Sequence, residues 1–483
     1  MNRVPVKLLC AWAALFMCTA LQASPVKYFG RVVSSGKGVP DVSVTDGRSV
    51  VRTDHAGRYV LESDGNAEFV YISVPSGYTV PLENNAPCFY RNVSDEEKEV
   101  LRVDFEIGAT MQDETRHMFF LWADVQVYEP EEVRYVEKAA ADVRHLVESS
   151  GLPAVGVTCG DIIGEWNYTP SLFMPVMAAT SQSGVPFYCA VGNHDMDMDA
   201  RSNEGSKRTF KSLFGPTYYS FNKGKVHYVV LDNVFYLALG YRTVGYIEET
   251  QLRWLENDLA NVPDGSTVVV CMHIPAYSRA ARHKEWGKEE LNKITCNRNA
   301  LYDILEPYNA HLLTAHEHYA ENYVMSDRLF EHVHPPLSGL FWQSKWSMDG
   351  VPWGYMVYEI DGDDVSWYYK PVGGSREDQF YAYPAGADPA RPDCVTANVW
   401  NYDPAWKVCW YEDGEFKGEM TRYSGWDRTI CEDVEARREK EFKWKYIGAG
   451  ETEHLFYAKP SSPEAVITVE VTDRFGNVYR KEL

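Results

Sequence analysis

Two histidines that stand two positions apart are the first feature of this sequence that points to chemistry. His316 and His318 lie in NAHLLTAHEHYAEN (residues 309–322), where the apolar run HLLTA ends. In an extended chain residues i and i+2 point to the same side, so both imidazoles would leave the end of a strand together. Imidazole is a common metal ligand. Taken alone, the pair indicates either a metal site or two polar loop residues that share a side by accident.

Residues of similar type follow the strand-like runs that precede this one. At the ends of four such runs stand Asp124 and Gln126, then Asp161, then Asn193, His194 and Asp195, and then His273. In open α/β sheets, ligands bind beyond the carboxyl ends of the strands. Five consecutive strand ends that carry Asp, Asn, Gln or His favour a metal centre over an accidental pair.

The elements that would position these residues alternate between strands and helices from about residue 117 to 372. In the segment 131–151, valines and alanines keep helical spacing, and Gly151 is a typical helix stop. Further helices are predicted near 170–183, 248–262 and 298–308, each between two strand-like runs. This alternation predicts a layered α/β domain.

Short alternating runs separated by turn signals flank this domain on both sides. Residues 25–108 read as a small β-sandwich, and the pattern GKGVPDVSVTDG followed by VRTDHAGRYVLE resembles the carboxypeptidase regulatory-like, transthyretin-like sandwich. This segment brings together no acid, base or nucleophile, so we expect a structural or docking role. Residues 376–483 contain short aromatic-rich strands and predict a second β-sandwich.

The N-terminus is typical of a secretory signal peptide. Arg3 and Lys7 precede the apolar run LLCAWAALFMCTAL, and LQAS offers a cleavage point near Ala23. We therefore expect a periplasmic or secreted protein; Met17 before Cys18 argues against lipid attachment. No later run is long and apolar enough to be a transmembrane segment.

Charge and cysteine content narrow the function further. The formal charge of the 483-residue chain is −22, which argues against nonspecific nucleic acid binding. The sequence has no CxxC pair, so a zinc site made of thiolates is not expected. Cys394, Cys409 and Cys431 could supply a disulfide in the C-terminal segment, with a pairing that the sequence leaves open.

The strand-end motifs DVQ, GDII, GNHD, MH and AHEH resemble, in order and spacing, those of the calcineurin-like metallophosphoesterases: D-x-H, G-D, G-N-H-[DE], a lone H and G-H-x-H. The resemblance covers residues 117–372. It implies an α/β fold class, with a central four-layer α/β/β/α metallophosphoesterase domain flanked by two β-sandwich domains. The expected limits are 1–23 for the signal peptide, 24–110 for the transthyretin-like sandwich, 111–375 for the metallophosphoesterase domain and 376–483 for the C-terminal sandwich.

The same resemblance implies two divalent metal ions bridged by Asp161. Asp124, Gln126 and His318 would complete one site, and Asn193, His273 and His316 the other. A hydroxide between two cations can exist near neutral pH, because metal binding lowers the pKa of water from 15.7 toward about 7, and it would attack phosphorus. His194 would stand beside the phosphoryl group and assist the reaction, while Asp195 orients its imidazole.

Two positions depart from the family pattern, and a third differs from that of the purple acid phosphatases. Ala315 replaces the usual glycine of G-H-x-H, which costs little backbone freedom. Gln126 stands where the family has histidine. An amide oxygen is a harder and weaker ligand than imidazole, so among Mn, Fe and Zn we expect Mn to be favoured at this position. Alternatively, Gln126 only forms a hydrogen bond nearby, and the first metal is loosely bound or absent. Gly164 occupies the position at which purple acid phosphatases have tyrosine, so no tyrosinate–iron chromophore is expected.

The sequence indicates the reaction more clearly than it indicates the substrate. A basic loop after His273 either reaches an anionic substrate or is a solvated surface; its members are Arg279, Arg282, His283 and Lys284. Trp342 and Trp346 line a substrate cleft or belong to the core. Phosphorylated small molecules, lipids and glycans all suit this chemistry, as do both monoesters and diesters, and the oligomeric state is open.

The sequence therefore predicts a dimetal-dependent hydrolase of phosphoric esters. The alternative is a non-catalytic extracytoplasmic binding protein that uses its β-sandwich domains. Retention of Asp161, Asn193, His194 and all three histidine ligands favours catalysis. A carbohydrate-active hydrolase would need two carboxylates facing each other across a cleft, and nothing singles out such a pair.

Overall fold

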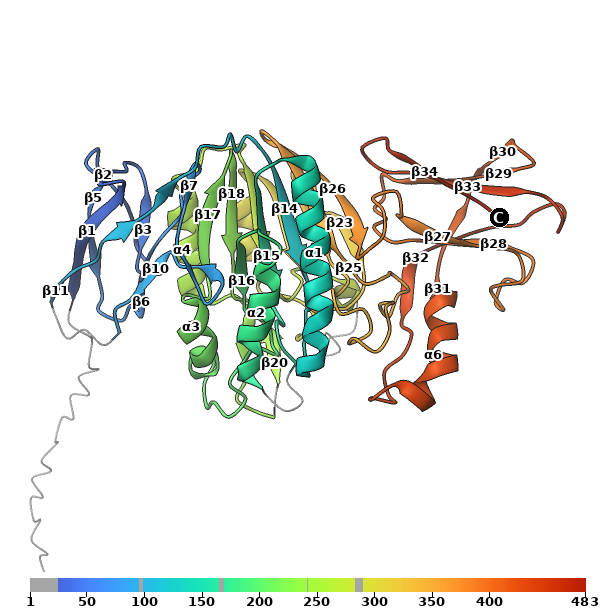
Figure 1. Cartoon of the computed structure of the whole chain (residues 1–483), viewed down its shortest axis with the longest axis horizontal. Helices are drawn as coiled ribbons and strands as arrows, with labels where there is room; N and C mark the ends of the chain where they lie inside the picture. The colour runs from blue at the N-terminus through green and yellow to red at the C-terminus, as the bar shows by residue number, and fades with distance from the viewer. Residues whose placement is uncertain (1–24, 95–98, 165–168, 241, 283–289) are drawn as a thin grey trace, which may run out of the picture.

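A computed structural model describes residues 25–94, 99–164, 169–240, 242–282 and 290–483. Three regions follow one another along the long axis of the molecule, from the N-terminal strands through the central sheets to the C-terminal strands (Figure 1). The predicted signal peptide lies outside the described residues, as do His283 and Lys284. Among the described helices, none is long and apolar enough to cross a membrane.

Two sheets form the central region. The first has the order β16 (Phe187–Ala190), β15 (Ala154–Cys159), β14 (Arg116–Trp122), β25 (Gly354–Asp361) and β26 (Asp364–Pro371). The second has the order β17 (Tyr219–Lys223), β18 (Val226–Val230), β21 (Thr267–Cys271), β22 (Asn309–Thr314), β24 (Leu329–Val333) and β23 (Glu321–Val324). Strands β14, β15 and β16 pair in parallel, as do β18, β21, β22 and β24. Their carboxyl ends therefore meet at one edge of each sheet.

Helices cover the two sheets, and the fold is mixed α/β as expected. Helices α1 (Val133–Ser150) and α2 (Phe173–Ser181) share an apolar core with the first sheet, and α1 ends at Gly151 with φ 65°. Helices α4 (Glu249–Leu259) and α5 (Arg298–Leu305) pack in the core of the second sheet. Helix α3 (Arg208–Phe214) precedes β17. The ring of Phe119 on β14 stacks on that of Tyr228 on β18 at 4.9 Å, so the two sheets face each other with the helices outside, which gives four layers.

The N-terminal region contains two small sheets. One combines β1 (Val26–Ser34) with β2 (Lys37–Gly38), β5 (Arg58–Ser63), β11 (Val100–Arg102) and β12 (Phe105–Glu106). The other has the order β10 (Tyr90–Asn92), β6 (Phe69–Ile72), β3 (Ser43–Thr45) and β4 (Val50–Arg52). Short pairs are β7 (Tyr78–Thr79) with β13 (Gly108–Ala109), β8 (Leu82–Glu83) with β9 (Ala86–Pro87), and, in the central region, β19 (Val234–Tyr236) with β20 (Thr243–Gly245).

The C-terminal region is also built on two sheets. The first has the order β27 (Phe380–Tyr383), β28 (Val395–Val399), β32 (Glu451–Ala458) and β31 (Thr421–Trp426). The second has the order β30 (Glu415–Glu419), β29 (Lys407–Glu412), β33 (Ile467–Thr472) and β34 (Val478–Glu482). Cys394, Cys409 and Cys431 are free thiols, so the suggested disulfide is not formed.

A helix that the sequence did not predict joins these strands. Helix α6 (Arg428–Glu441) begins after Asp427, whose side chain accepts a hydrogen bond from the Ile430 amide at 3.2 Å. Only Ile430 and Val434 of this helix are buried. Two apolar residues give no recognisable helical period, so the sequence pattern of this segment does not reveal a helix within the predicted β-sandwich.

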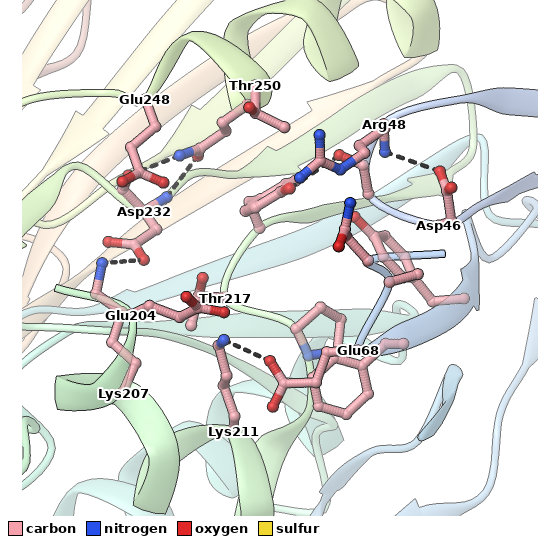
Figure 2. A pocket seen from close by; sticks show the side chains of 18 of the residues that line it. Asp46, Arg48, Glu68, Glu204, Lys207, Lys211, Thr217, Asp232, Glu248 and Thr250 are labelled. Atoms are coloured by element: carbon pink, nitrogen blue, oxygen red, sulfur yellow. Dashed lines mark hydrogen bonds and ion pairs between the residues drawn. The ribbon is translucent and has the colours of Figure 1, made fainter. Parts of the chain in front are cut away.

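The N-terminal region is fixed to the central region by both apolar and ionic contacts. The ring of Phe89 lies 4.4 Å from that of Tyr219, and one apolar core runs through both regions. A polar cavity of about 270 Å³ lies at this junction. Figure 2 shows Lys211 of α3 pointing across it to Glu68 of the N-terminal region, with Nζ 2.5 Å from Oε2. These contacts hold the first sandwich against the side of the second central sheet.

Candidate metal centre

Four of the predicted ligands form one cluster beyond the strand ends. Asp161, His273 and His316 each offer a ligand atom within 4.8 Å of the others. His273 Nε2 lies 3.1 Å from Asn193 Oδ1, 3.4 Å from Asp161 Oδ1 and 3.2 Å from His316 Nδ1. The structure thus brings together residues from β15, β16, β21 and β22 that are up to 155 positions apart in the chain.

The chemistry of this cluster fits a cation. His273 Nδ1 lies 2.9 Å from the carbonyl oxygen of Cys159, so we assign its proton to Nδ1, which leaves the Nε2 lone pair facing the Asn193 and Asp161 oxygens. Burial lowers the pKa of His273, but the charge of Asp161 and a hydrogen bond to it, together with Asp124 and the Cys159 carbonyl group, outweigh burial and raise the pKa to about 9. The converging acceptors therefore require a positive charge between them, which a divalent metal ion would supply in place of a proton.

The remaining predicted ligands form a second group on the other side of Asp161. His318 Nε2 lies 3.4 Å from Asp124 Oδ1, and the amide of Gln126 donates to Asp161 Oδ2 at 3.1 Å. Asp124 Oδ1 and Gln126 Oε1 are buried and have no hydrogen-bond partner among the described residues. Buried acceptors without a partner are costly, and a second cation would satisfy both. Asp161 faces one group with each carboxylate oxygen, so it could be shared by two cations.

Most of the predicted ligands lie on backbone in the left-handed region. The φ angles are 43° at Asp124, 41° at Gln126, 52° at Asp161, 70° at His316 and 59° at His318. Residues other than glycine rarely adopt this conformation, which costs about 1–2 kcal/mol each and is concentrated at functional sites. The strain is consistent with a site that fixes its side chains before anything binds.

Two glycines allow the ligand loops to approach one another. A Cβ atom on Gly192 would lie 2.1 Å from Asp161 Oδ1, and one on Gly160 would lie 2.4 Å from His273 Nδ1. Both distances are far below contact. The G-D and G-N-H motifs therefore contain glycine because the neighbouring loop occupies the space that a side chain would need.

His194 lies beside the cluster, and Asp195 makes other contacts than the predicted one with the His194 imidazole. The His194 amide donates to Asp161 Oδ1 at 2.8 Å, and its Nε2 lies 3.7 Å from Asp161 Oδ2. Asp195 accepts hydrogen bonds from the amides of Ile162 and Ile163 on Oδ1 and of Gly192 on Oδ2. Its carboxylate therefore fastens the loop after β15 to the loop after β16 and does not orient the imidazole.

The two described arginines of the basic loop do not reach toward the metal centre. Arg279 Nη1 donates to the carbonyl oxygen of Glu451 at 2.6 Å, and its Nε lies 3.3 Å from Glu321 Oε1. Arg282 donates to both carboxylate oxygens of Glu453 at 2.6 and 2.8 Å. The short helix η4 (Arg279–Arg282) thus ties the central region to the C-terminal region, and the proposed contact of these arginines with substrate is not supported.

The aromatic loop after β24 contributes to the centre through other residues than predicted. Trp342 stacks on Tyr135 and its Nε1 donates to the carbonyl oxygen of Val125 at 2.9 Å, so it packs behind the site. Trp346 packs on Tyr381 of the C-terminal region. Phe341, which sequence reasoning passed over, places its ring 4.6 Å from that of His318. No sequence signal distinguishes Phe341 from Trp342, because neighbouring side chains differ here only in direction.

Three family models match successive parts of the chain. Residues 26–110 match the N terminal of calcineurin-like phosphoesterase, residues 130–320 match calcineurin-like phosphoesterase, and residues 331–479 match the C terminal of calcineurin-like phosphoesterase. Purple acid phosphatase 15 of Arabidopsis thaliana is 26% identical over 248 residues, which cover 47% of this chain and 38% of that protein. The match thus spans well under half of the plant protein.

Solved structures with a similar arrangement include a dimetal phosphatase from Danio rerio, with a TM-score of 0.39 and 14% identity over 53% of this chain and 96% of that one. The purple acid phosphatase PPD1 from yellow lupin (Lupinus luteus) has a TM-score of 0.36 and 12% identity over 73% of this chain and 68% of that one. The motifs and the successive family models agree along most of the chain, and this protein belongs to the calcineurin-like phosphoesterase superfamily.

Proposed function

We propose that this protein is a dimetal-dependent hydrolase of phosphoric esters that acts outside the cytoplasm. The observation that carries the proposal is the convergence of oxygen and imidazole acceptors on both sides of Asp161, where Asp124 Oδ1 and Gln126 Oε1 have no hydrogen bond to any residue that the structure describes. Members of this superfamily use a dimetal centre. The extracytoplasmic location rests on the signal-like N-terminal sequence.

The bound metals would supply an activated water and charge stabilisation for displacement at phosphorus. Asp124, Gln126 and His318 would hold one ion, Asn193, His273 and His316 the other, and Asp161 both. His194 is 15% exposed at its side chain, so it can donate a hydrogen bond or a proton to a phosphoryl or leaving-group oxygen. The substrate is a phosphomonoester or phosphodiester of a small molecule, lipid or glycan, and Mn is our preferred metal at the Gln126 position.

The test is turnover of p-nitrophenyl phosphate and bis-p-nitrophenyl phosphate by protein loaded with Mn²⁺. We expect metal-dependent turnover that Asp161→Asn abolishes and that the exposed Asp264→Asn, a matched control, leaves intact. Metal content is measured beside activity. Failure of the wild-type protein both to bind metal and to turn over either ester would refute the proposal and favour the non-catalytic binding protein.

The role of His194 is tested separately. Because it is not assigned as a ligand, His194→Ala should retain the metal content of the wild type while turnover falls by about 10²- to 10⁴-fold, the usual contribution of a positioned acid or base. Loss of metal in this variant would instead make His194 part of the metal site.

A further inference from the structure

We infer that Phe341 and Trp444 form a subsite for the organic group of the phosphoester, and that this group has a flat, apolar or aromatic face. The inference rests on the proposed function, because it concerns the substrate of the same centre. It assigns to the C-terminal region, which supplies Trp444, a direct part in substrate selection.

The rings form a continuous wall that starts at a proposed metal ligand. Phe341 lies 4.6 Å from the ring of His318, Trp444 lies 6.0 Å from Phe341 in an edge-on arrangement, and Tyr128 lies 4.6 Å from Trp444. Phe341 and Trp444 are partly exposed, whereas Tyr128 is 7% exposed and backs them. A substrate whose phosphoryl group lies at the metals would meet these two rings on the His318 side.

The backbone around Phe341 is held in an unusual conformation that separates the two neighbouring aromatic side chains. Phe341 and Trp342 have φ angles of 52° and 61°, which bulky residues rarely adopt. Trp342 packs behind the site through its hydrogen bond to Val125 and its stacking on Tyr135. The ring of Phe341 therefore lies on the side of the metal centre, beside His318. The left-handed backbone conformation thus places an aromatic side chain at the site.

Trp444 is fixed from both sides. Its amide donates to Gln343 Oε1 at 3.1 Å, and the preceding residue, Lys443, forms an ion pair with Glu129. Glu129 directly follows Tyr128 in the chain. The segment after α6 is thus clamped to the loop that carries Phe341 and to the loop after β14. A wall that is fixed before binding recognises a ligand at low entropic cost.

The chemistry of the wall favours a neutral, flat group over a second anion. Lys443 is paired with Glu129, and Arg279 and Arg282 are paired with acids of the second central sheet and the C-terminal region. The wall itself consists of aromatic rings, which bind flat apolar groups by stacking or edge contacts. An aryl group or a similar ring on the phosphoester is therefore the class of substrate that this wall would select.

The experiment compares binding of phenylphosphonate and methylphosphonate to the Mn²⁺-loaded protein by calorimetry. Neither ligand is hydrolysed, so the readout does not depend on turnover. We expect the wild-type protein to bind phenylphosphonate about tenfold more tightly, the order contributed by one well-placed ring contact. Trp444→Ala and Phe341→Leu should remove this preference and leave methylphosphonate affinity unchanged, whereas Trp444→Phe should retain part of it.

A matched control removes an exposed tryptophan elsewhere in the C-terminal region. Trp426, which is 56% exposed, should be replaceable by alanine without effect on either ligand. Equal binding of the two phosphonates by a wild-type protein that hydrolyses phosphoesters would overturn the subsite and leave the proposed function standing. Absence of binding of both, together with absence of turnover, would overturn both. A parallel loss of both affinities in Trp444→Ala would make the residue a structural support and refute selection.

Discussion

Gln126 is where this chain departs most from the ligand pattern of its superfamily, and its surroundings are informative. Its side chain is 1% exposed, its amide group donates to Asp161 Oδ2, and Oε1 has no hydrogen-bond partner among the described residues. A half-turn of the amide group would exchange Oε1 and Nε2, so that Oε1 would face Asp161 Oδ2. We predict that Gln126→His will bind Zn²⁺ at the first position about tenfold more tightly, or by about 1.4 kcal/mol, because imidazole is the stronger ligand for zinc.

The measurement is zinc stoichiometry and affinity by competition with a chelator. Gln182→His, on the exposed residue that follows α2, controls for the addition of an imidazole elsewhere on the protein. If the affinity and stoichiometry of Gln126→His match those of the wild type, Gln126 is not a ligand and only forms a hydrogen bond with Asp161.

At the scale of residues, the sequence predicts which side chains come close together but not which partner each side chain contacts. The strand-end residues converge because parallel strands present their carboxyl ends on one edge. The sequence predicts a different role for Asp195 and does not single out Phe341, because the partners of both side chains depend on the path of a loop. The left-handed conformations at Asp161 and Phe341 redirect side chains, and no pattern of residue types reveals them.

At the scale of elements, two histidines join strands through the same arrangement of bonds. His117 Nδ1 lies 2.9 Å from the Glu114 carbonyl oxygen and its Nε2 lies 2.6 Å from the Tyr228 hydroxyl. His334 contacts the Thr314 carbonyl oxygen at 2.6 Å and the Tyr358 hydroxyl at 2.7 Å. Burial lowers the pKa of each imidazole from 6.5 to about 4. Both are therefore neutral in the folded protein at neutral pH.

These histidines predict acid sensitivity of the central region. The unfolded chain takes up each proton near pH 6.5 and the folded one near pH 4, so the stabilisation is complete above pH 6.5 and is lost as the pH falls toward 4. For one imidazole the loss at pH 5 is about 2 kcal/mol. His334→Gln preserves a donor for Thr314 and an acceptor for Tyr358 but does not titrate, so its unfolding temperature should fall less than that of the wild type between pH 7 and pH 5.

The comparison with the wild type cancels the titration of the metal-centre residues, which both proteins share. His145→Gln, on the exposed face of α1, is the matched control and should have the pH dependence of the wild type. An identical decrease of the unfolding temperature in His334→Gln and the wild type would show that His334 does not contribute to the acid sensitivity.

The helices could be predicted from the sequence where their pattern of apolar residues extends over several turns. Helices α1 and α4 carry regular buried stripes and lie where the periodicity placed them. Helix α6 buries only Ile430 and Val434 and was missed. It forms because Asp427 caps it and because Ile430 and Val434 pack in a small apolar cluster. That cluster includes Leu340, which is distant in sequence. Contacts of this kind cannot be obtained from a local pattern.

At the scale of the whole molecule, the three regions are joined in two different ways. The N-terminal and central regions share one apolar core, in which Phe89 packs against Tyr188 and Tyr219. The C-terminal sheets enclose a core of their own. They meet the central region through buried polar contacts, such as that of His454 with Asp349, and through ring contacts, such as that of Trp346 with Tyr381. We therefore expect the first two regions to unfold together and the C-terminal sheets to respond more independently.

Phe89→Ala tests this coupling. Phe89 is 2% exposed, and its truncation should destabilise the shared core by about 3–5 kcal/mol, the usual cost of a buried Phe→Ala change. The effect should reach beyond the N-terminal region, because a cavity in a common core weakens every element packed around it. Hydrogen exchange measured by mass spectrometry should show faster exchange in peptides of β1 and β6, and also in those of β14 and β18, while peptides of β29 and β33 keep their protection.

Leu82→Ala provides the control, because Leu82 lies in the same region and is 57% exposed. Its exchange pattern should equal that of the wild type. Faster exchange confined to β1 and β6 in Phe89→Ala would mean that the N-terminal region opens alone and is only docked on the central sheets. Faster exchange that includes β14, whose end carries Asp124, would mean that the N-terminal sandwich stabilises the layer from which the metal centre is built, as the continuous core requires.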